Sequence, residues 1–255
     1  MAAPDVARGE QLIGVRLGGP ATRRPPWRID GDAPDLGWLT GSMRWPAGQP
    51  LPPQLGDAQV VPHLAVVLGD PLTGPGVTPA GALAAVASVH AAVELTSAGS
   101  GPDAPAVELA ADSAPAVPAA ELAADSAPAV PAVAGLAARD ADPDVPAVAG
   151  QAAGDRRWFV VSPAGRPAAG LDLALEACLV EVGGQVTDSG TGAAAAGHPA
   201  EALAWAANAL DAQGLALEPG WLILTGPLTA PVPLPPAAPA AVHFTTLGSL
   251  FLPPT

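Results

Sequence analysis

A thirteen-residue, proline-bearing unit interrupts this chain and sets the strongest limit on its fold. The unit Ala106-Val-Glu-Leu-Ala-Ala-Asp-Ser-Ala-Pro-Ala-Val-Pro118 is followed at once by a near-identical copy at 119–131 and by a degraded copy that ends at Pro146. Proline every few residues prevents a long helix, and three short units cannot bury a stacked core. We therefore expect residues 98–152 to be a flexible insert and residues 1–97 and 153–255 to form one domain. The alternative is that the insert works as a spacer or docking segment.

Charge and composition exclude several classes of function. The formal net charge is −14, all ten basic residues are arginine, and residues 98–152 hold eight acidic residues against one arginine. Without lysine the chain has neither a Schiff-base amine nor a P-loop lysine, and no basic cluster favours nucleic acid. No apolar span reaches membrane length. We expect a soluble, cytoplasmic protein that binds neither nucleic acid nor membrane.

Local patterns predict a β-rich α+β domain with few helices. A helix should begin at Pro79, with Thr78 as its N-cap, and run to about Ala91. A second should begin at Pro199 and bury a stripe formed by Leu203, Ala206, Ala207 and Leu210. Residues 20–57 should be an ordered loop, and Cys178 a buried strand residue. Strands are predicted at 11–17, 60–68, 93–96, 158–161, 221–225 and 242–246, with a hairpin formed by 171–182 and 185–187.

Several segments, in order, resemble the 2-keto-4-pentenoate hydratase and 4-oxalocrotonate decarboxylase family of the fumarylacetoacetate hydrolase superfamily. The most specific is the stretch 190–208, which contains Gly197-His198-Pro199 and the start of the second helix. Residues 67–78, 222–231 and 247–249 are similar to further family blocks. The resemblance covers most of the chain outside the insert, and it implies a mixed-sheet roll or sandwich of the superfamily's C-terminal type.

The resemblance also implies a divalent-metal site. Family members hold Mg²⁺ or Mn²⁺ with a Glu-x-Glu pair and a third Glu, because a hard cation prefers carboxylate oxygens. Here Val61 and His63 stand at the first two positions and Glu94 matches the third, while Arg16 aligns with a family lysine. The repeats displace a polar family stretch that follows the third Glu. We expect no cofactor, the alternative being Mg²⁺ or Mn²⁺ bound at Glu94 with an incomplete ligand set.

The same resemblance implies that His63 and Glu94 face one pocket. They would form an acid–base dyad that removes a proton next to a carbonyl, unless His63 merely lines the pocket or core. Arg16 would bind a substrate carboxylate, or else form a structural ion pair. Thr225 and Thr229 match a segment near the family pocket and would hydrogen-bond to substrate. His198 should cap its helix, and His90 and His243 have no partner that the spacing reveals.

These observations favour a divergent lyase. It would act on an enolisable 2-oxo acid or a related small carbonyl compound by proton transfer, in hydration, dehydration, decarboxylation or cyclisation. The alternative is a catalytically inactive relative that serves as a ligand-binding or partner subunit. The family resemblance implies a homo-oligomer or a complex with a partner lyase subunit as the assembly.

Overall fold

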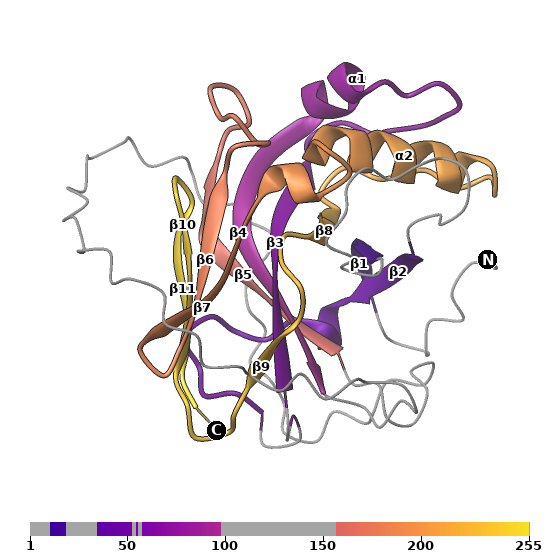
Figure 1. Ribbon diagram of the computed structural model, residues 1–255. Coiled ribbons are helices and arrows are strands. Elements are labelled where there is room, and N and C mark those ends of the chain that lie inside the picture. Colours follow the sequence, from indigo (N-terminus) through magenta and orange to yellow (C-terminus); the bar gives the residue numbers. More distant parts are fainter. Residues whose placement is uncertain (1–10, 19–34, 53–54, 56–57, 98–156, 255) are drawn as a thin grey trace.

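The strands of this protein form two sheets that pack face to face (Figure 1). The computed structural model describes residues 11–18, 35–52, 55, 58–97 and 157–254. The larger sheet has the order β2-β1-β8-β3-β4-β5, with β9 paired to β3, and the smaller has the order β11-β10-β6-β7. The larger sheet contains β1 (Leu12–Gly18), β2 (Asp35–Thr40), β3 (Ala58–Leu68), β4 (Val86–Ser97), β5 (Arg157–Arg166), β8 (Leu222–Pro227) and β9 (Val232–Leu234). The smaller contains β6 (Ala177–Val182), β7 (Gln185–Thr191), β10 (Ala240–Phe244) and β11 (Gly248–Leu252).

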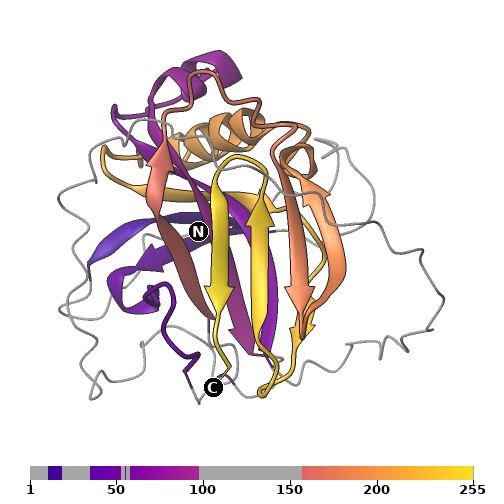
Figure 2. The ribbon, with the colours of Figure 1, turned by 90° about the vertical axis from the view of Figure 1, so that its left-hand side faces the viewer.

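The main core lies between the two sheets. Because side chains alternate along a strand, Leu64 and Val93 of the larger sheet point towards Val180 and Val242 of the smaller one. Figure 2 shows the smaller sheet in front of the larger one, with the helices α1 (Pro79–Ala84) and α2 (Pro199–Asp211) above both. The predicted β-rich α+β class with a mixed-sheet sandwich and few helices is confirmed.

The larger sheet is mixed because β1 runs parallel to β8. Gly14 lies opposite Leu222 in this pair, and a Cβ atom added at Gly14 would come within 1.8 Å of the Leu222 carbonyl oxygen. Only glycine permits the two backbones to approach so closely. The first strand of the chain is therefore fixed beside one of the last.

The prediction for the first helix is correct at its start and wrong at its end. Thr78 accepts a hydrogen bond from the Gly81 backbone N–H at 3.2 Å, as an N-cap should. The helix stops at Ala84, and β4 begins at Val86 instead of continuing helically to about residue 91. β4 pairs with β3 along the whole of that strand and buries Val89 completely. Tertiary pairing thus overrides the helix propensity of the alanines.

The structure confirms the predicted hairpin turn and the predicted strands, but one strand starts later than predicted and some strands were not predicted at all. β6 and β7 are joined by Gly183 and Gly184, whose φ angles of 60° and 82° are those of a type I′ turn. The first hairpin strand begins only at Ala177, because the preceding residues form turns. Three strands were not predicted: β2 within the expected loop 20–57, β9 within a proline-rich stretch, and β11.

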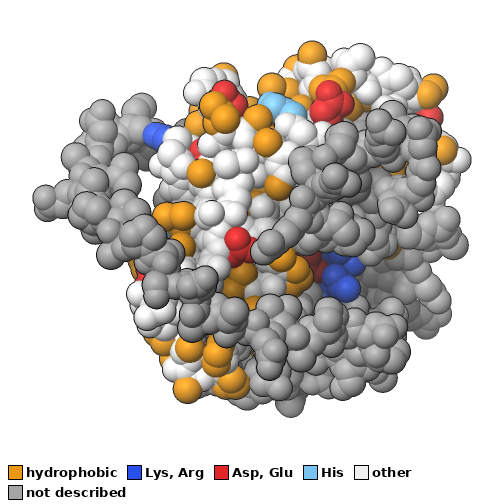
Figure 3. Space-filling model, viewed as in Figure 1, with side chains coloured by type: hydrophobic (Ala, Val, Ile, Leu, Met, Phe, Trp, Pro, Cys, Tyr) orange, Lys and Arg blue, Asp and Glu red, His pale blue; other side chains and the backbone are white. Residues whose placement is uncertain are grey.

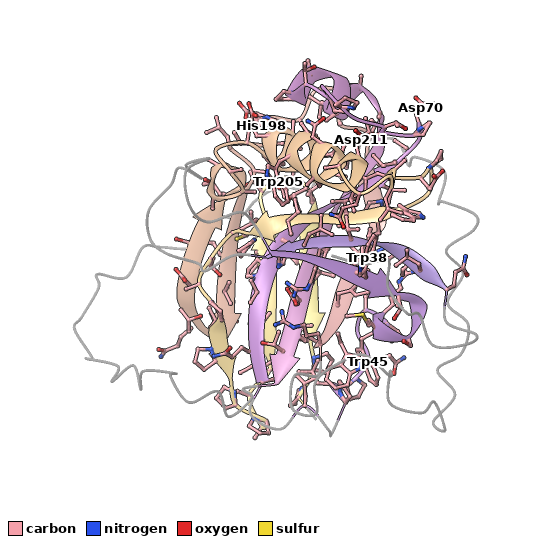
Figure 4. All side chains as sticks on the ribbon, turned by 90° about the vertical axis from the view of Figure 1, so that its right-hand side faces the viewer. Trp38, Trp45, Asp70, His198, Trp205 and Asp211 are labelled. Carbon is pink, nitrogen blue, oxygen red and sulfur yellow. The ribbon has the colours of Figure 1, made fainter. Side chains whose placement is uncertain are left out.

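The second helix confirms its predicted cap and buried stripe. His198 Nδ1 accepts a hydrogen bond from the Ala200 N–H at 3.0 Å. Near the other end, Asn208 Oδ1 accepts from the N–H groups of Gly76 and Val77, at 2.8 and 3.0 Å. Figure 4 shows His198 and Asp211 towards opposite ends of α2. The family-like segments 67–78 and 190–208 therefore supply the cap of α2 and the contact between α2 and the loop that contains Gly76 and Val77.

The strands on either side of the repeats are direct neighbours. β4 ends at Ser97, β5 begins at Arg157, and Thr96 pairs with Arg157 in an antiparallel ladder. The predicted insert, residues 98–152, lies outside the described residues. Among the residues that the structure describes, no helix is long and apolar enough to cross a membrane.

Candidate active site

Four charged or titratable side chains meet on the face of the larger sheet that points away from the smaller sheet. They are Arg16 of β1, His63 of β3, Glu94 of β4 and Arg157 of β5. The pairing of β4 with β3 and β5 brings these side chains together, because Glu94 lies opposite Val61 on one side and opposite Phe159 on the other. Residues two positions along a strand share a face, so His63 and Arg157 point to the same side as Glu94. We call these four residues the charge cluster.

The Glu94 carboxylate is the centre of the charge cluster. Its Oε1 atom accepts a hydrogen bond from Arg157 Nη1 at 3.0 Å and lies 3.7 Å from Arg16 Nε. Its Oε2 atom lies 3.5 Å from His63 Nε2. The side chain of Glu94 is only 7% exposed. Two arginines therefore hold one oxygen and the imidazole faces the other.

These neighbours keep Glu94 ionised. Burial alone would raise the pKa of its carboxyl group, because it penalises the charged form. Contact with His63 and the positive charges of His63, Arg16 and Arg157 outweigh burial and lower the pKa to about 2. Glu94 is thus a carboxylate throughout the physiological range, and it serves as an acceptor rather than as an acid.

His63 is the deepest member of the charge cluster. It is 1% exposed, and neither ring nitrogen has a hydrogen-bond partner among the residues that the structure describes. The 3.5 Å contact with Glu94 is an ion-pair distance, at the long limit for a hydrogen bond. Buried polar atoms are normally satisfied, so Nδ1, which has neither a hydrogen bond nor an ion-pair contact among the described residues, points to a group that is supplied by a ligand or water.

A glycine on the edge strand makes room for Arg16. Gly37 of β2 pairs with Arg16, and a Cβ atom at Gly37 would lie 2.7 Å from Arg16 Nε. The edge strand β2, which the sequence did not predict, thus shapes the position of the guanidinium. On the face drawn in Figure 3, arginine atoms lie beside acidic atoms at one place below and to the right of the centre.

The two predicted threonines do not join the charge cluster. Thr225 is fully buried and donates a hydrogen bond to the Leu64 carbonyl at 3.1 Å. It alternates with Leu224, so its side chain points to the opposite face of the sheet from the cluster. Thr229 donates to the Ala230 carbonyl at 2.8 Å and lies against Gly190 of β7. Both hydroxyl hydrogens are engaged by backbone carbonyls.

The remaining strand histidines have structural partners. His90, which lies in β4 and not in the predicted helix, contacts Ser88 Oγ and the Ser162 carbonyl, each at 2.9 Å. Burial, as the largest cause, lowers the pKa of His90. His243 contacts Ser249 Oγ at 2.9 Å on the smaller sheet. Neither histidine is in contact with Glu94.

Sequence reasoning missed Arg157. The residue stands two positions before Phe159, which is the cross-strand partner of Glu94, and its side chain is 28% exposed. The available signal was an arginine at the start of an apolar strand, directly after the repeats. This arginine can be assigned to the site only when β5 is known to pair with β4.

The charge cluster does not fit the metal site that the family resemblance implies. Such a site needs several oxygen ligands, whereas Val61 has none and Glu94 Oε1 already accepts from Arg157. Within the described part of the chain, no group of three His, Cys, Asp or Glu side chains is placed to hold a metal ion. Two guanidinium groups would also repel a divalent cation.

Comparisons with known proteins show that the chain is similar to hydratases and decarboxylases. It is 30% identical to the 2-hydroxyhexa-2,4-dienoate hydratase of Comamonas testosteroni over 236 residues, which are 91% of this chain and 73% of that enzyme. Its fold is similar to that of 4-oxalocrotonate decarboxylase from Pseudomonas putida G7, solved with magnesium and adipate. That comparison has a TM-score of 0.68 and 22% identity, over 98% of this chain and 80% of the other.

A second solved structure has a similar fold. A fumarylacetoacetate hydrolase family protein from Yersinia pestis CO92 matches with a TM-score of 0.59 and 14% identity, over 97% of this chain and 94% of the other. No protein-family model matches the chain.

Proposed function

This chain belongs to the 2-keto-4-pentenoate hydratase/4-oxalocrotonate decarboxylase family of the fumarylacetoacetate hydrolase superfamily, and from that membership we propose that it is a lyase acting on an enolisable 2-oxo acid. One observation supports the proposal above the others. His63, Glu94 and Arg16 come from three different strands and meet in one buried cluster, in which His63 Nε2 faces Glu94 and Nδ1 has no hydrogen-bond partner among the described residues.

The chemistry required of such an enzyme is proton transfer at carbon. A base removes a proton next to the 2-oxo group, or an acid delivers one to the enol, and negative charge develops on the enolate oxygen in between. His63 would carry this proton, because Glu94 is held ionised with a pKa of about 2 and arginine does not release its proton. Glu94 would hold the imidazole in place.

Arg16 would bind the carboxylate of the substrate. A guanidinium presents parallel N–H donors that match a carboxylate, and it stays charged at every working pH. Its side chain is 11% exposed and lies 3.7 Å from Glu94, so a carboxylate that it binds would lie beside the acid–base pair. Thr225 and Thr229 remain predicted substrate contacts, although their present hydrogen bonds run to backbone carbonyls.

Ultraviolet-monitored turnover of 2-hydroxypenta-2,4-dienoate and 4-oxalocrotonate tests the proposal. We expect turnover by the purified protein, and a loss of about 10²- to 10⁴-fold in kcat for His63→Gln, which is the usual contribution of a general acid–base. His243→Gln is the matched control, since His243 lies on the smaller sheet. Its kcat should equal that of the unchanged protein.

Two outcomes would count against the proposal. Equal kcat for His63→Gln and His243→Gln would remove His63 from the chemistry. A correctly folded protein that turns over neither compound, with or without Mg²⁺ or Mn²⁺, would favour a catalytically inactive, ligand-binding or partner subunit.

A further inference from the structure

A second apolar core lies on the same face of the larger sheet as the charge cluster. Because side chains alternate along a strand, Ala65 of β3 shares this face with His63. Ala92 of β4 shares it with Glu94 in the same way. This core is separate from the main core between the two sheets. We use the name outer core for five of its residues, which are Ala65, Ala92, Phe159, Val161 and Leu224.

Strand pairing places the outer core directly beside the charge cluster. The opposing pairs are Glu94 with Phe159, His63 with Ala92, and Arg16 with Leu224. Along β5, the side chain of Arg157 is 28% exposed, whereas Phe159 is fully buried. The end of the site that faces solvent is therefore at Arg157, and the outer core forms its buried end.

His63 indicates which part of a ligand would lie at the buried end. Glu94 is ionised and only accepts hydrogen bonds, so a neutral His63 carries its hydrogen on Nε2, which faces Glu94 at 3.5 Å. Nδ1 then carries the lone pair, and it has no hydrogen-bond partner among the described residues. The base of the proposed reaction would thus be Nδ1, and the carbon that loses its proton would lie within reach of it.

The ligand atoms beyond that carbon would meet hydrocarbon. Ala65 and Ala92 bring only methyl groups to the surface beside His63. The larger Leu224 and Val161 lie opposite these two alanines on the neighbouring strands. No residue of the outer core has a charge or a polar side-chain hydrogen. An apolar chain gains free energy against such a surface, whereas a carboxylate there loses its hydration without gaining a partner.

We propose that the outer core receives the hydrocarbon tail of the substrate, so that this chain acts on 2-oxo monocarboxylates and their enols in preference to dicarboxylates. The inference rests on the proposed function for the head group, which is the 2-oxo carboxylate. It adds the class of tail and a residue that selects it, Ala92, whose methyl group lies opposite His63. The kcat/KM for 2-hydroxypenta-2,4-dienoate should therefore exceed that for 4-oxalocrotonate, which carries a second carboxylate.

Calorimetric binding of a series of 2-oxo acids tests the inference without turnover. Pyruvate, 2-oxobutyrate and 2-oxovalerate differ only in tail length, and 2-oxoglutarate is 2-oxovalerate with its terminal methyl group replaced by a carboxylate. All of them share one head group, so the ratios of their Kd values do not depend on how that group is held. Each added methylene should lower the Kd about fourfold, and 2-oxoglutarate should bind at least about tenfold more weakly than 2-oxovalerate.

Ala92→Val and Ala91→Val form a matched pair of variants. The two residues are adjacent in β4, both are fully buried, and they point to opposite faces of the sheet. Ala92→Val occupies the place beside His63, so the ratio of the pyruvate Kd to the 2-oxovalerate Kd should fall from about 16 to about 4 or less. Ala91→Val adds the same methyl groups on the main-core side and should leave the ratio unchanged. Circular dichroism shows whether each variant is folded, and the ligand series in the unchanged protein is decisive if either is not.

Equal Kd values from pyruvate to 2-oxovalerate, or 2-oxoglutarate binding as tightly as 2-oxovalerate, would overturn the inference. So would an unchanged Kd ratio in folded Ala92→Val, or a folded protein that binds none of these acids. Tail-dependent binding without turnover would leave the inference standing and count against the proposed function. Turnover of 2-hydroxypenta-2,4-dienoate together with equal Kd values would do the reverse.

Discussion

Replacing Glu94 by glutamine should cost stability in a strongly pH-dependent way. The pKa of Glu94 is about 2 in the folded protein against an ordinary value of 4.5, a difference of about 2.5. At ~1.36 kcal/mol per pKa unit, the ionised carboxylate contributes about 3 kcal/mol to the free energy of unfolding at neutral pH. Because the folded-state pKa is the lower one, this stabilisation is complete above about pH 5 and disappears as the pH falls towards 2.

Urea denaturation of the unchanged protein and of Glu94→Gln, at pH 7, 5, 4 and 3, measures this contribution. The difference in free energy of unfolding should be about 3 kcal/mol at pH 7 and should fall to roughly half of that at pH 3. Glu218→Gln is the control, because Glu218 is exposed. A difference for Glu94→Gln that stays the same from pH 7 to pH 3 would refute the electrostatic account of the cluster.

Three further outcomes are expected. Asn208→Ala should lower the free energy of unfolding by about 1–2 kcal/mol, since two N–H donors of the 76–77 loop lose their acceptor; unchanged urea unfolding would contradict this. Burial raises the pKa of Cys178 to about 12, so a disulfide reagent at pH 8 should label no thiol in the folded protein and one after denaturation. Gly37→Ala should push Arg16 from Glu94 and raise the KM for 2-hydroxypenta-2,4-dienoate severalfold, which ultraviolet-monitored kinetics would detect.

Local signals predicted most of the elements but not their pairing. Thr78-Pro79, His198-Pro199 and Gly183-Gly184 carry their structure in adjacent residues, so the two helix starts and the hairpin turn were predictable. The stretch 86–91 misled the prediction, because alanine-rich sequence favours a helix when the partner strand β3 is unknown.

The candidate site was predictable only in part, because its composition also depends on strand pairing. The resemblance implied that His63 and Glu94 converge, and their 3.5 Å contact agrees with it. Arg157 could not be placed, because its position depends on β5 returning beside β4 after the repeats. Thr225 stays a predicted substrate contact, but its family-like sequence block did not reveal that alternation along β8 turns its side chain to the other face of the sheet.

The parallel pairing of β1 with β8 has a consequence for the order of folding. β8 separates β1 from β3, so residues 222–227 must be synthesised before the middle of the larger sheet can close. Until then β1 and β3 each keep an unpaired edge, which is a surface on which chains can associate wrongly. Contacts this far apart in sequence also form slowly. β1 and β3 therefore cannot be joined into one sheet until most of the chain, including β8, has been synthesised.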